Sequence, residues 1–241
     1  MDIEILIIVI VFLLILILIA YLIVSFCKNV VFETLIENME NGMHVDINSY
    51  ANIDDPYTKP FVIPNLLSRE ECDQLIDYCI DKLEVSGIDG GYVNIKNNQQ
   101  CWIPKDNLLV KPSIEKIAKI FDLPVENAED ILIMKYLPNQ YYNNHHDSCC
   151  DINDKCKDFV KRGGQRILSV LIYLNKDFED GQTNFKNSNL TFNPERGHAI
   201  IIFPLAQNSN KCHPGATHNG LSAHKGIKWI MNIWFRENAF V

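Results

Sequence analysis

The segment His145-His146-Asp147 places two possible metal ligands two residues apart. Side chains two apart in a strand point to the same face, so His145 and Asp147 can reach one metal ion while His146 points away. Two imidazoles and one carboxylate on one face of an octahedral ion form the ligand set of non-haem Fe(II) oxygenases, which leaves positions open. His-x-Asp alone is a weak signal, because a polar loop also produces it. The hypothesis therefore needs a second histidine elsewhere in the chain.

The candidate for that ligand is His218, which is followed ten residues later by Lys228 in the apolar segment 226–235. The alternation of side chains along this segment gives two largely apolar faces, which predicts a strand covered on both sides. A lysine in such a strand is costly to bury without a fixed anionic partner. No acidic residue within the strand offers one, whereas a dicarboxylate co-substrate would.

Three further histidines compete as ligands. His146 has the wrong strand parity, His213 precedes a Pro-Gly turn, and His224 is four residues from Lys228. We interpret each of them as a loop or surface residue.

These motifs and their order resemble the prolyl 4-hydroxylase-like branch of the 2-oxoglutarate- and Fe(II)-dependent dioxygenases. The resemblance runs from about Phe61 to Glu237. It is carried by Tyr-Leu-Pro-Asn-Gln-Tyr-Tyr-Asn-Asn-His-His-Asp at 136–147, the strand and turn at 166–175, Gly-Gln-Thr-Asn-Phe at 181–185, Pro-Glu-Arg-Gly-His-Ala at 194–199, and His218 with Lys228. The skew toward Asn, Ile and Lys further suggests the homologues that giant viruses encode.

The resemblance implies an α+β, mainly β domain: a double-stranded β-helix (jelly-roll) core with supporting N-terminal helices. It implies Fe(II) held by His145, Asp147 and His218. It also implies hydroxylation of peptidyl proline to 4-hydroxyproline, with O2 consumed and 2-oxoglutarate decarboxylated to succinate and CO2. A Pro-rich or collagen-like polypeptide is the implied substrate, and L-ascorbate (vitamin C) the implied reductant.

Co-substrate and substrate contacts are also implied by the resemblance. The C5 carboxylate of 2-oxoglutarate would lie on Lys228, with Tyr136 and Thr183 as secondary contacts. The candidate substrate contacts are Arg166, Trp234 and Tyr142. The chain departs from the family pattern at Ser222, where a proline is usual, and at 98–102, which replaces an Arg-Thr-Ser-like stretch; both changes could affect the peptide groove.

Two other functions remain open. One keeps the cofactors but acts on lysyl side chains or nucleic-acid bases, although relatives of that kind typically anchor the co-substrate with arginine. The net charge of −8, from 22 basic and 30 acidic residues, also disfavours nucleic acid. The other is an inert jelly-roll that binds Pro-rich segments at the membrane. The presence of all three predicted metal ligands and of Lys228 argues against this function.

The elements that must position these residues can be read from the pattern. Ser68 and Glu71 form a capping box that starts one helix, and 112–121 reads as a second. Five β-prone runs separated by turn residues follow, which predicts an antiparallel double sheet or barrel. These runs are 131–137, 167–174, 190–192, 198–203 and 227–235.

An uncharged, almost wholly aliphatic run from Ile5 to Phe26 spans roughly 33 Å as a helix, enough to cross a bilayer. The sequence therefore predicts a single-pass protein with a signal-anchor and the lipid bilayer as a partner. The expected domains are a head at 1–4, a transmembrane anchor at 5–26, a stalk at 27–58 and the dioxygenase domain at 59–241. Lys28 is thin evidence on orientation; we expect the catalytic domain in the endoplasmic reticulum lumen or on a virion-associated membrane.

Seven of the eight cysteines follow residue 27. Cys72 and Cys79 fall on the capped helix and read as core residues. Cys149-Cys150 with Cys156 could form a disulfide or remain thiols, and the odd number leaves the redox compartment open. Asn189 is a glycosylation acceptor if the domain faces a lumen.

Overall fold

The computed structural model describes residues 50–86, 98–151, 153–207 and 209–241. Residues from Asn48 onward form one compact unit. The predicted head, anchor and most of the stalk lie outside the described residues, so the structure does not test them.

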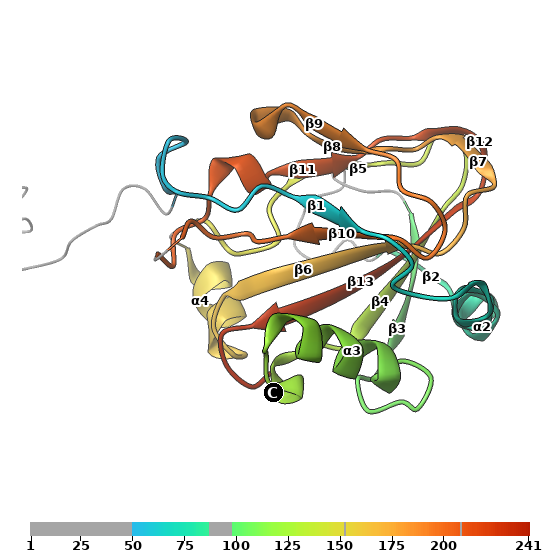
Figure 1. Cartoon of the computed structure of the whole chain (residues 1–241), viewed down its shortest axis with the longest axis horizontal. Helices are drawn as coiled ribbons and strands as arrows, with labels where there is room; N and C mark the ends of the chain where they lie inside the picture. Colours follow the sequence, from blue (N-terminus) through green and yellow to red (C-terminus); the bar gives the residue numbers. More distant parts are fainter. Residues whose placement is uncertain (1–49, 87–97, 152, 208) are drawn as a thin grey trace, which may run out of the picture. The chain divides into compact units, whose positions relative to one another are not determined.

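Two antiparallel sheets make up most of this unit, and Figure 1 shows the smaller one lying above the larger. Within the described ranges the larger sheet has seven strands. In spatial order they are β1 (Phe61–Ile63), β10 (Ala199–Ile202), β6 (Arg166–Tyr173), β13 (Lys228–Arg236), β4 (Ile131–Tyr136), β3 (Gln99–Ile103) and β2 (Glu84–Val85). The smaller sheet runs β5 (Tyr142–His145), β11 (His218–Gly220), β8 (Thr183–Phe185) and β9 (Leu190–Phe192), and β12 (Ala223–Gly226) pairs with β7 (Phe178–Asp180). The mainly β prediction is confirmed, and its five β-prone runs correspond to β4, β6, β9, β10 and β13.

Strand β13 lies at the centre of the larger sheet and is buried along its whole length. Its odd-numbered residues from Trp229 to Phe235 belong to the core under the helices. Lys228, Ile230 and Asn232 point the other way and line a pocket. The predicted division of this strand into two covered faces is therefore confirmed.

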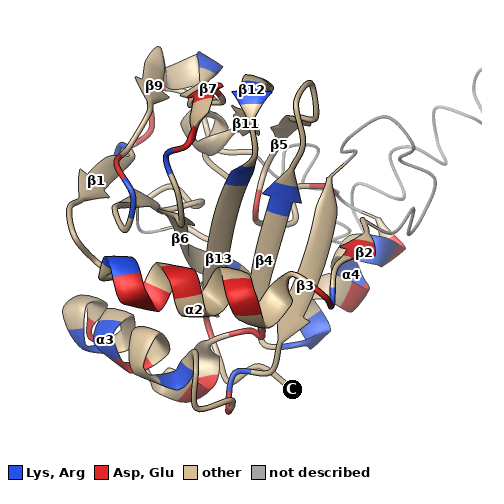
Figure 2. Cartoon of the chain, turned by 90° about the vertical axis from the view of Figure 1, so that its right-hand side faces the viewer, with Lys and Arg blue, Asp and Glu red and all other residues tan. Residues whose placement is uncertain are grey.

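Two helices, α2 (Arg69–Cys79) and α3 (Lys111–Phe121), pack on the outer face of the larger sheet. Figure 2 shows α2 running across the strands. Ser68 and Glu71 form the predicted capping box, which satisfies N–H groups that the helix start leaves without partners. A third helix, α4 (Asp154–Lys161), is capped by Asn153 and lies in the polar insert between β5 and β6. The short 3-10 turns are η1 (Val125–Asn127), η2 (Lys186–Ser188) and η3 (Pro214–Ala216).

Three disulfides link the described residues: Cys79–Cys101, Cys149–Cys156 and Cys150–Cys212. Cys72 is buried and outside these bonds. Cys79 is therefore more than the core residue we expected, because it joins α2 to β3.

The predicted membrane localisation requires a correction. No helix in the part of the chain that the structure describes is long and apolar enough to cross a bilayer, and the run 5–26 itself lies outside those residues. The finding conflicts with a single-pass membrane protein. We therefore withdraw the predicted single-pass membrane location, lumenal or virion-associated, whereas the run 5–26 itself is not tested by the described residues.

Candidate active site

Strand pairing brings the three predicted ligands together. β5 ends at His145, Asp147 follows two residues later, and β11 begins at His218, which lies opposite His145 in the antiparallel register. Asp147 Oδ1 is 3.8 Å from His145 Nε2, and Asp147 Oδ2 is 3.9 Å from His218 Nε2. One ligand atom from each residue lies within 4.8 Å of the other two.

The hydrogen bonds of the two imidazoles show what this cluster can bind. His145 Nδ1 lies 2.8 Å from the carbonyl of Asn143, and His218 Nδ1 lies 3.0 Å from that of Ala216. A carbonyl can only accept, so each Nδ1 carries the proton and each Nε2 presents a lone pair toward Asp147. The Nε2–carboxylate distances are too long for hydrogen bonds. Three hydrogen-bond acceptors thus converge without an N–H or O–H group between them. A metal cation, which binds such lone pairs, fits this arrangement.

Electrostatics keeps these groups ready to bind a metal. Burial, reinforced by His218, lowers the pKa of His145 to about 3, so its imidazole stays neutral. Burial opposes ionisation of Asp147, but the attraction of His218, His145 and Arg166 outweighs it and lowers the pKa of this carboxyl below its usual range. Neutral imidazoles and an ionised carboxylate are the forms that coordinate metal ions.

His146 points away from the cluster, as strand parity predicted. Its Nδ1 accepts from the Ser148 amide at 3.1 Å, and its Nε2 lies 3.3 Å from the His213 carbonyl. His224 is exposed, as expected. His213 lies in a loop before η3, which is one of the two expected alternatives, but it is buried: it is 3% exposed, stacks on Tyr57 and caps η3 by accepting from the Gly215 N–H.

The predicted co-substrate anchor lies in the same pocket as the three ligands. Lys228 is 2% exposed, and its Nζ donates to the carbonyl of Gly181 at 2.6 Å. The ion pairs of the described residues do not include it. Burial, with a smaller effect from Lys176, lowers its pKa from 10.5 to about 7. The burial of this lysine agrees with the predicted strand, and in the described part of the chain its ammonium meets a backbone carbonyl.

The pocket is a partly open recess of about 400 Å³, a volume that includes open solvent. Its polar lining is Tyr136, Tyr142, His145, Asp147, Thr183, His218, Lys228 and Asn232, and its apolar lining is Met134, Leu171, Ile202 and Ile230. A small dianion bound here would meet the three predicted metal ligands and an ammonium group in one pocket.

Comparison with known proteins agrees with this geometry. Residues 131–236 match the model of the 2OG-Fe(II) oxygenase superfamily. A putative prolyl 4-hydroxylase of Acanthamoeba polyphaga mimivirus is 53% identical over 193 residues, which cover 80% of each chain. The chain belongs to the prolyl 4-hydroxylase family. It is a 2-oxoglutarate-dependent dioxygenase, and this family implies Fe²⁺, 2-oxoglutarate and O2.

More distant relatives of this prolyl 4-hydroxylase-like chain extend the likeness. Prolyl 4-hydroxylase 1 of Arabidopsis thaliana is 26% identical over 200 residues, covering 74% of this chain and 69% of that one. The viral collagen prolyl hydroxylase of Paramecium Bursaria Chlorella virus-1, solved with 2-oxoglutarate, superposes with a TM-score of 0.60 at 27% identity. The match covers 73% of this chain and 95% of that one. The viral relatives agree with the hint from composition.

The two predicted secondary contacts of this dioxygenase, Tyr136 and Thr183, both line the pocket. Tyr136 lies opposite Lys228 in the β4–β13 register, and its hydroxyl donates to the weak acceptor Met134 Sδ at 3.3 Å. Thr183 Oγ1 is 2.8 Å from the Tyr173 hydroxyl. Sequence reasoning missed Tyr173, whose ring centroid lies 4.9 Å from Lys228 Nζ; its place on the inward face of β6 was the available signal.

The three candidate substrate contacts separate into two places. Tyr142 lines the pocket and stacks on His145 with ring centroids 3.6 Å apart. Arg166 and Trp234 lie outside this lining, and the Arg166 guanidinium is 3.8 Å from the centroid of the Trp234 ring. Trp102, 49% exposed, lies 6.3 Å from Trp234, which is itself only 6% exposed.

A buried ion cluster supports this side of the site and was missed by the sequence reasoning. Glu129 accepts from Arg166 through both oxygens at 2.7 Å and from Arg236 Nε at 2.7 Å. Arg166 Nη1 also donates to the carbonyl of Asp147 at 3.3 Å. Burial alone would raise the pKa of Glu129, but the two guanidinium groups lower it below the usual value. The cluster thus connects Asp147, one of the predicted ligands, to the central strands β6 and β13.

Proposed function

We propose that this chain forms 4-hydroxyproline in a polypeptide, with His145, Asp147 and His218 holding Fe²⁺ and Lys228 holding the C5 carboxylate of 2-oxoglutarate. The observation that carries the proposal is the convergence of three metal-ligand atoms in the same pocket as a buried ammonium group, which no carboxylate of the described residues pairs. We further propose that the two sheets form a double-stranded β-helix core and that 59–241 is the catalytic domain.

The protein's own residues supply binding and orientation. The carbonyls of Asn143 and Ala216 fix the tautomers of the ligand histidines, so that both Nε2 atoms face Asp147. When bound, Fe²⁺ together with 2-oxoglutarate and O2 supplies the oxidising chemistry that inserts an oxygen atom into a C–H bond, with succinate and CO2 as co-products. The apolar side of the pocket excludes water from that reaction.

Lys228 recognises the co-substrate by charge. An isolated buried ammonium is costly, which is why the pKa of Lys228 falls to about 7 in the ligand-free protein. A carboxylate that enters the pocket supplies the missing counter-charge and favours the protonated lysine. Thr183 and Tyr136 line the pocket as further polar contacts, and we propose that they also bind 2-oxoglutarate.

We propose that the peptide docks beside the pocket, against Tyr142, Arg166 and Trp234. Grooves lined by aromatic side chains bind polyproline II segments, and Trp102, 49% exposed near Trp234, offers such a side chain at the surface. One viral relative is titled a collagen prolyl hydroxylase, so a Pro-rich or collagen-like polypeptide is the proposed substrate. L-Ascorbate as reductant rests on the family resemblance alone.

Mass spectrometry of peptides tests the substrate directly. The chain is incubated with Fe²⁺, 2-oxoglutarate and either a Pro-rich peptide or a matched peptide with alanine at each proline. We expect the mass of one added oxygen atom on proline and none on the alanine peptide. Oxygen found on lysine in a Lys-containing peptide, with none on proline, would favour the lysyl alternative. An unmodified peptide with no succinate formed would favour the inert jelly-roll.

A further inference from the structure

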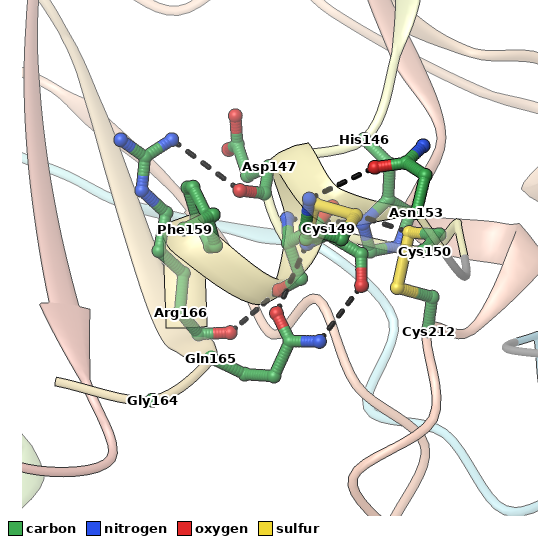
Figure 3. The surroundings of a disulfide bond; sticks show 12 residues. His146, Asp147, Cys149, Cys150, Asn153, Phe159, Gly164, Gln165, Arg166 and Cys212 are labelled. Carbon is green, nitrogen blue, oxygen red and sulfur yellow. Dashed lines mark hydrogen bonds between the residues drawn. A yellow bond between two sulfur atoms is a disulfide. The ribbon is translucent and has the colours of Figure 1, made fainter. Parts of the chain in front are cut away.

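Two disulfides surround the segment that follows the ligand Asp147. Cys149 bonds to Cys156, seven residues along the chain, and Cys150 bonds to Cys212, 62 residues along. Figure 3 shows both bonds beside Asp147 and the start of β6. The first closes a local loop around the start of α4, whereas the second joins two distant segments.

The segment reached by Cys150–Cys212 is the one that carries His218. From Cys212 the chain passes through η3, whose Ala216 carbonyl orients the His218 imidazole, and enters β11 at His218. Cys150 follows Asp147 by three residues. The disulfide therefore forms a short covalent path between two of the three ligands.

Other contacts hold Asp147 to a different part of the fold. Arg166 donates to the Asp147 carbonyl and accepts at its own carbonyl from Ser148 Oγ at 2.6 Å. The Gln165 side-chain amide binds both the N–H and the carbonyl of Cys149, at 3.0 and 2.7 Å (Figure 3). All of these bonds lead to the start of β6, and none of them reaches the segment 212–218.

The non-covalent link between the two ligand segments is weak. The hydrogen bond from His146 Nε2 to the His213 carbonyl is long at 3.3 Å. The β5–β11 pairing has a register irregularity between His218 and Gly220. The pairing sets His145 against His218, but Asp147 lies beyond the end of β5 and outside the ladder.

We propose that the Cys150–Cys212 disulfide is a positioning element of the metal site, so that metal affinity depends on the redox state of this cysteine pair. The proposal rests on the metal site proposed above. A dithiol reductant would give two electrons and two protons to the bond, leaving two thiols and itself becoming a disulfide. The segment bearing Asp147 would then lose its covalent path to His218 while keeping its contacts to β6.

The neighbouring disulfide provides a matched control. Full-length metal-free chains of wild type, C150S/C212S and C149S/C156S are titrated with Mn²⁺ by calorimetry, and circular dichroism verifies that each is folded. Mn²⁺ is the probe because reduced Cys150 and Cys212, which lie beside His146, would attract a softer ion. We expect C150S/C212S to bind Mn²⁺ at least about tenfold more weakly, the loss typical of removing support from a metal ligand, and C149S/C156S to bind within about twofold of wild type.

Reversible reduction of the wild type keeps the proposal testable if C150S/C212S does not fold. Affinity should fall when a dithiol reductant opens the bond, as verified by alkylation and mass spectrometry, and should recover on reoxidation. Equal Mn²⁺ affinity in oxidised and reduced chains, or an equal loss in both double variants, would overturn the proposal. A wild-type chain that binds no Mn²⁺ would instead contradict the metal site itself.

Discussion

Replacing Lys228 by methionine should stabilise the ligand-free protein and weaken co-substrate binding. The pKa of Lys228 falls from 10.5 to about 7 on burial, and each pKa unit corresponds to about 1.4 kcal/mol. Burying this ammonium therefore costs about 5 kcal/mol. The thioether side chain would also leave the Gly181 carbonyl without its 2.6 Å donor, a loss of about 1–3 kcal/mol. The expected net gain for Lys228→Met in the ligand-free protein is about 3 kcal/mol, or roughly 6–12 °C in Tm.

The same substitution should have the opposite effect on binding. The C5 carboxylate of 2-oxoglutarate would be buried without a counter-charge, which costs about 3–5 kcal/mol, or at least about 100-fold in affinity. Urea denaturation with and without 2-oxoglutarate measures both effects. Lys135→Met is the control, because this lysine lies on β4 over the Trp229 ring and outside the pocket; it should change stability by less than about 1 kcal/mol.

The pH dependence of stability tests the same pKa shift independently. Between pH 7 and 10.5 the unfolded chain binds the Lys228 proton and the folded chain does not, so the stability of the wild type should rise with pH across this window. Lys228→Met should remove that rise. A Lys228→Met protein that is less stable than wild type without ligand, or that binds 2-oxoglutarate within tenfold of wild type, would refute the reasoning.

Three further outcomes are expected. The affinity of wild type for 2-oxoglutarate should fall about tenfold per pH unit above pH 7, because the complex must take up the Lys228 proton. Calorimetry in buffers of different ionisation enthalpy should detect nearly one proton bound. An affinity that does not change with pH would exclude this lysine as the anchor. Glu129→Gln should destabilise the fold by about 3–5 kcal/mol in urea denaturation, since it leaves two guanidinium groups without their carboxylate, whereas Glu126→Gln on the exposed turn should change it by less than about 0.5 kcal/mol. Mn²⁺ at 100-fold excess over its Kd should stabilise the wild type by about 2.7 kcal/mol and raise its Tm. His145→Gln should lose this rise in Tm, while His146→Gln should keep most of it. If His146→Gln lost the rise and His145→Gln kept it, the metal site would lie at His146.

Local patterns were sufficient for the larger elements. The capping box at Ser68, the five β-prone runs and the two faces of β13 all depend on residues close together in the chain, and each is present. Strand parity also separated His145 and Asp147 from His146. These features follow from local backbone geometry and from the alternation of side chains along a strand, and both can be predicted from a single sequence.

Features that depend on distant pairing were not predictable. The register that sets His145 opposite His218 is a product of the fold, and very short strands such as β2 and β11 carry too few residues to show a period. Nothing in the sequence around Glu129 indicates its two arginine partners, which reach it only because β6 and β13 pair in the folded sheet. Sequence alone left the cysteine pairing open because seven cysteines allow many connectivities.

A crystal structure with Mn²⁺ and 2-oxoglutarate is the most direct test of the central claim. The account predicts one anomalous peak coordinated by His145 Nε2, His218 Nε2 and the Asp147 carboxylate, with the C5 carboxylate of 2-oxoglutarate on Lys228 Nζ. A metal ion held by other residues, or a co-substrate carboxylate away from Lys228, would contradict it.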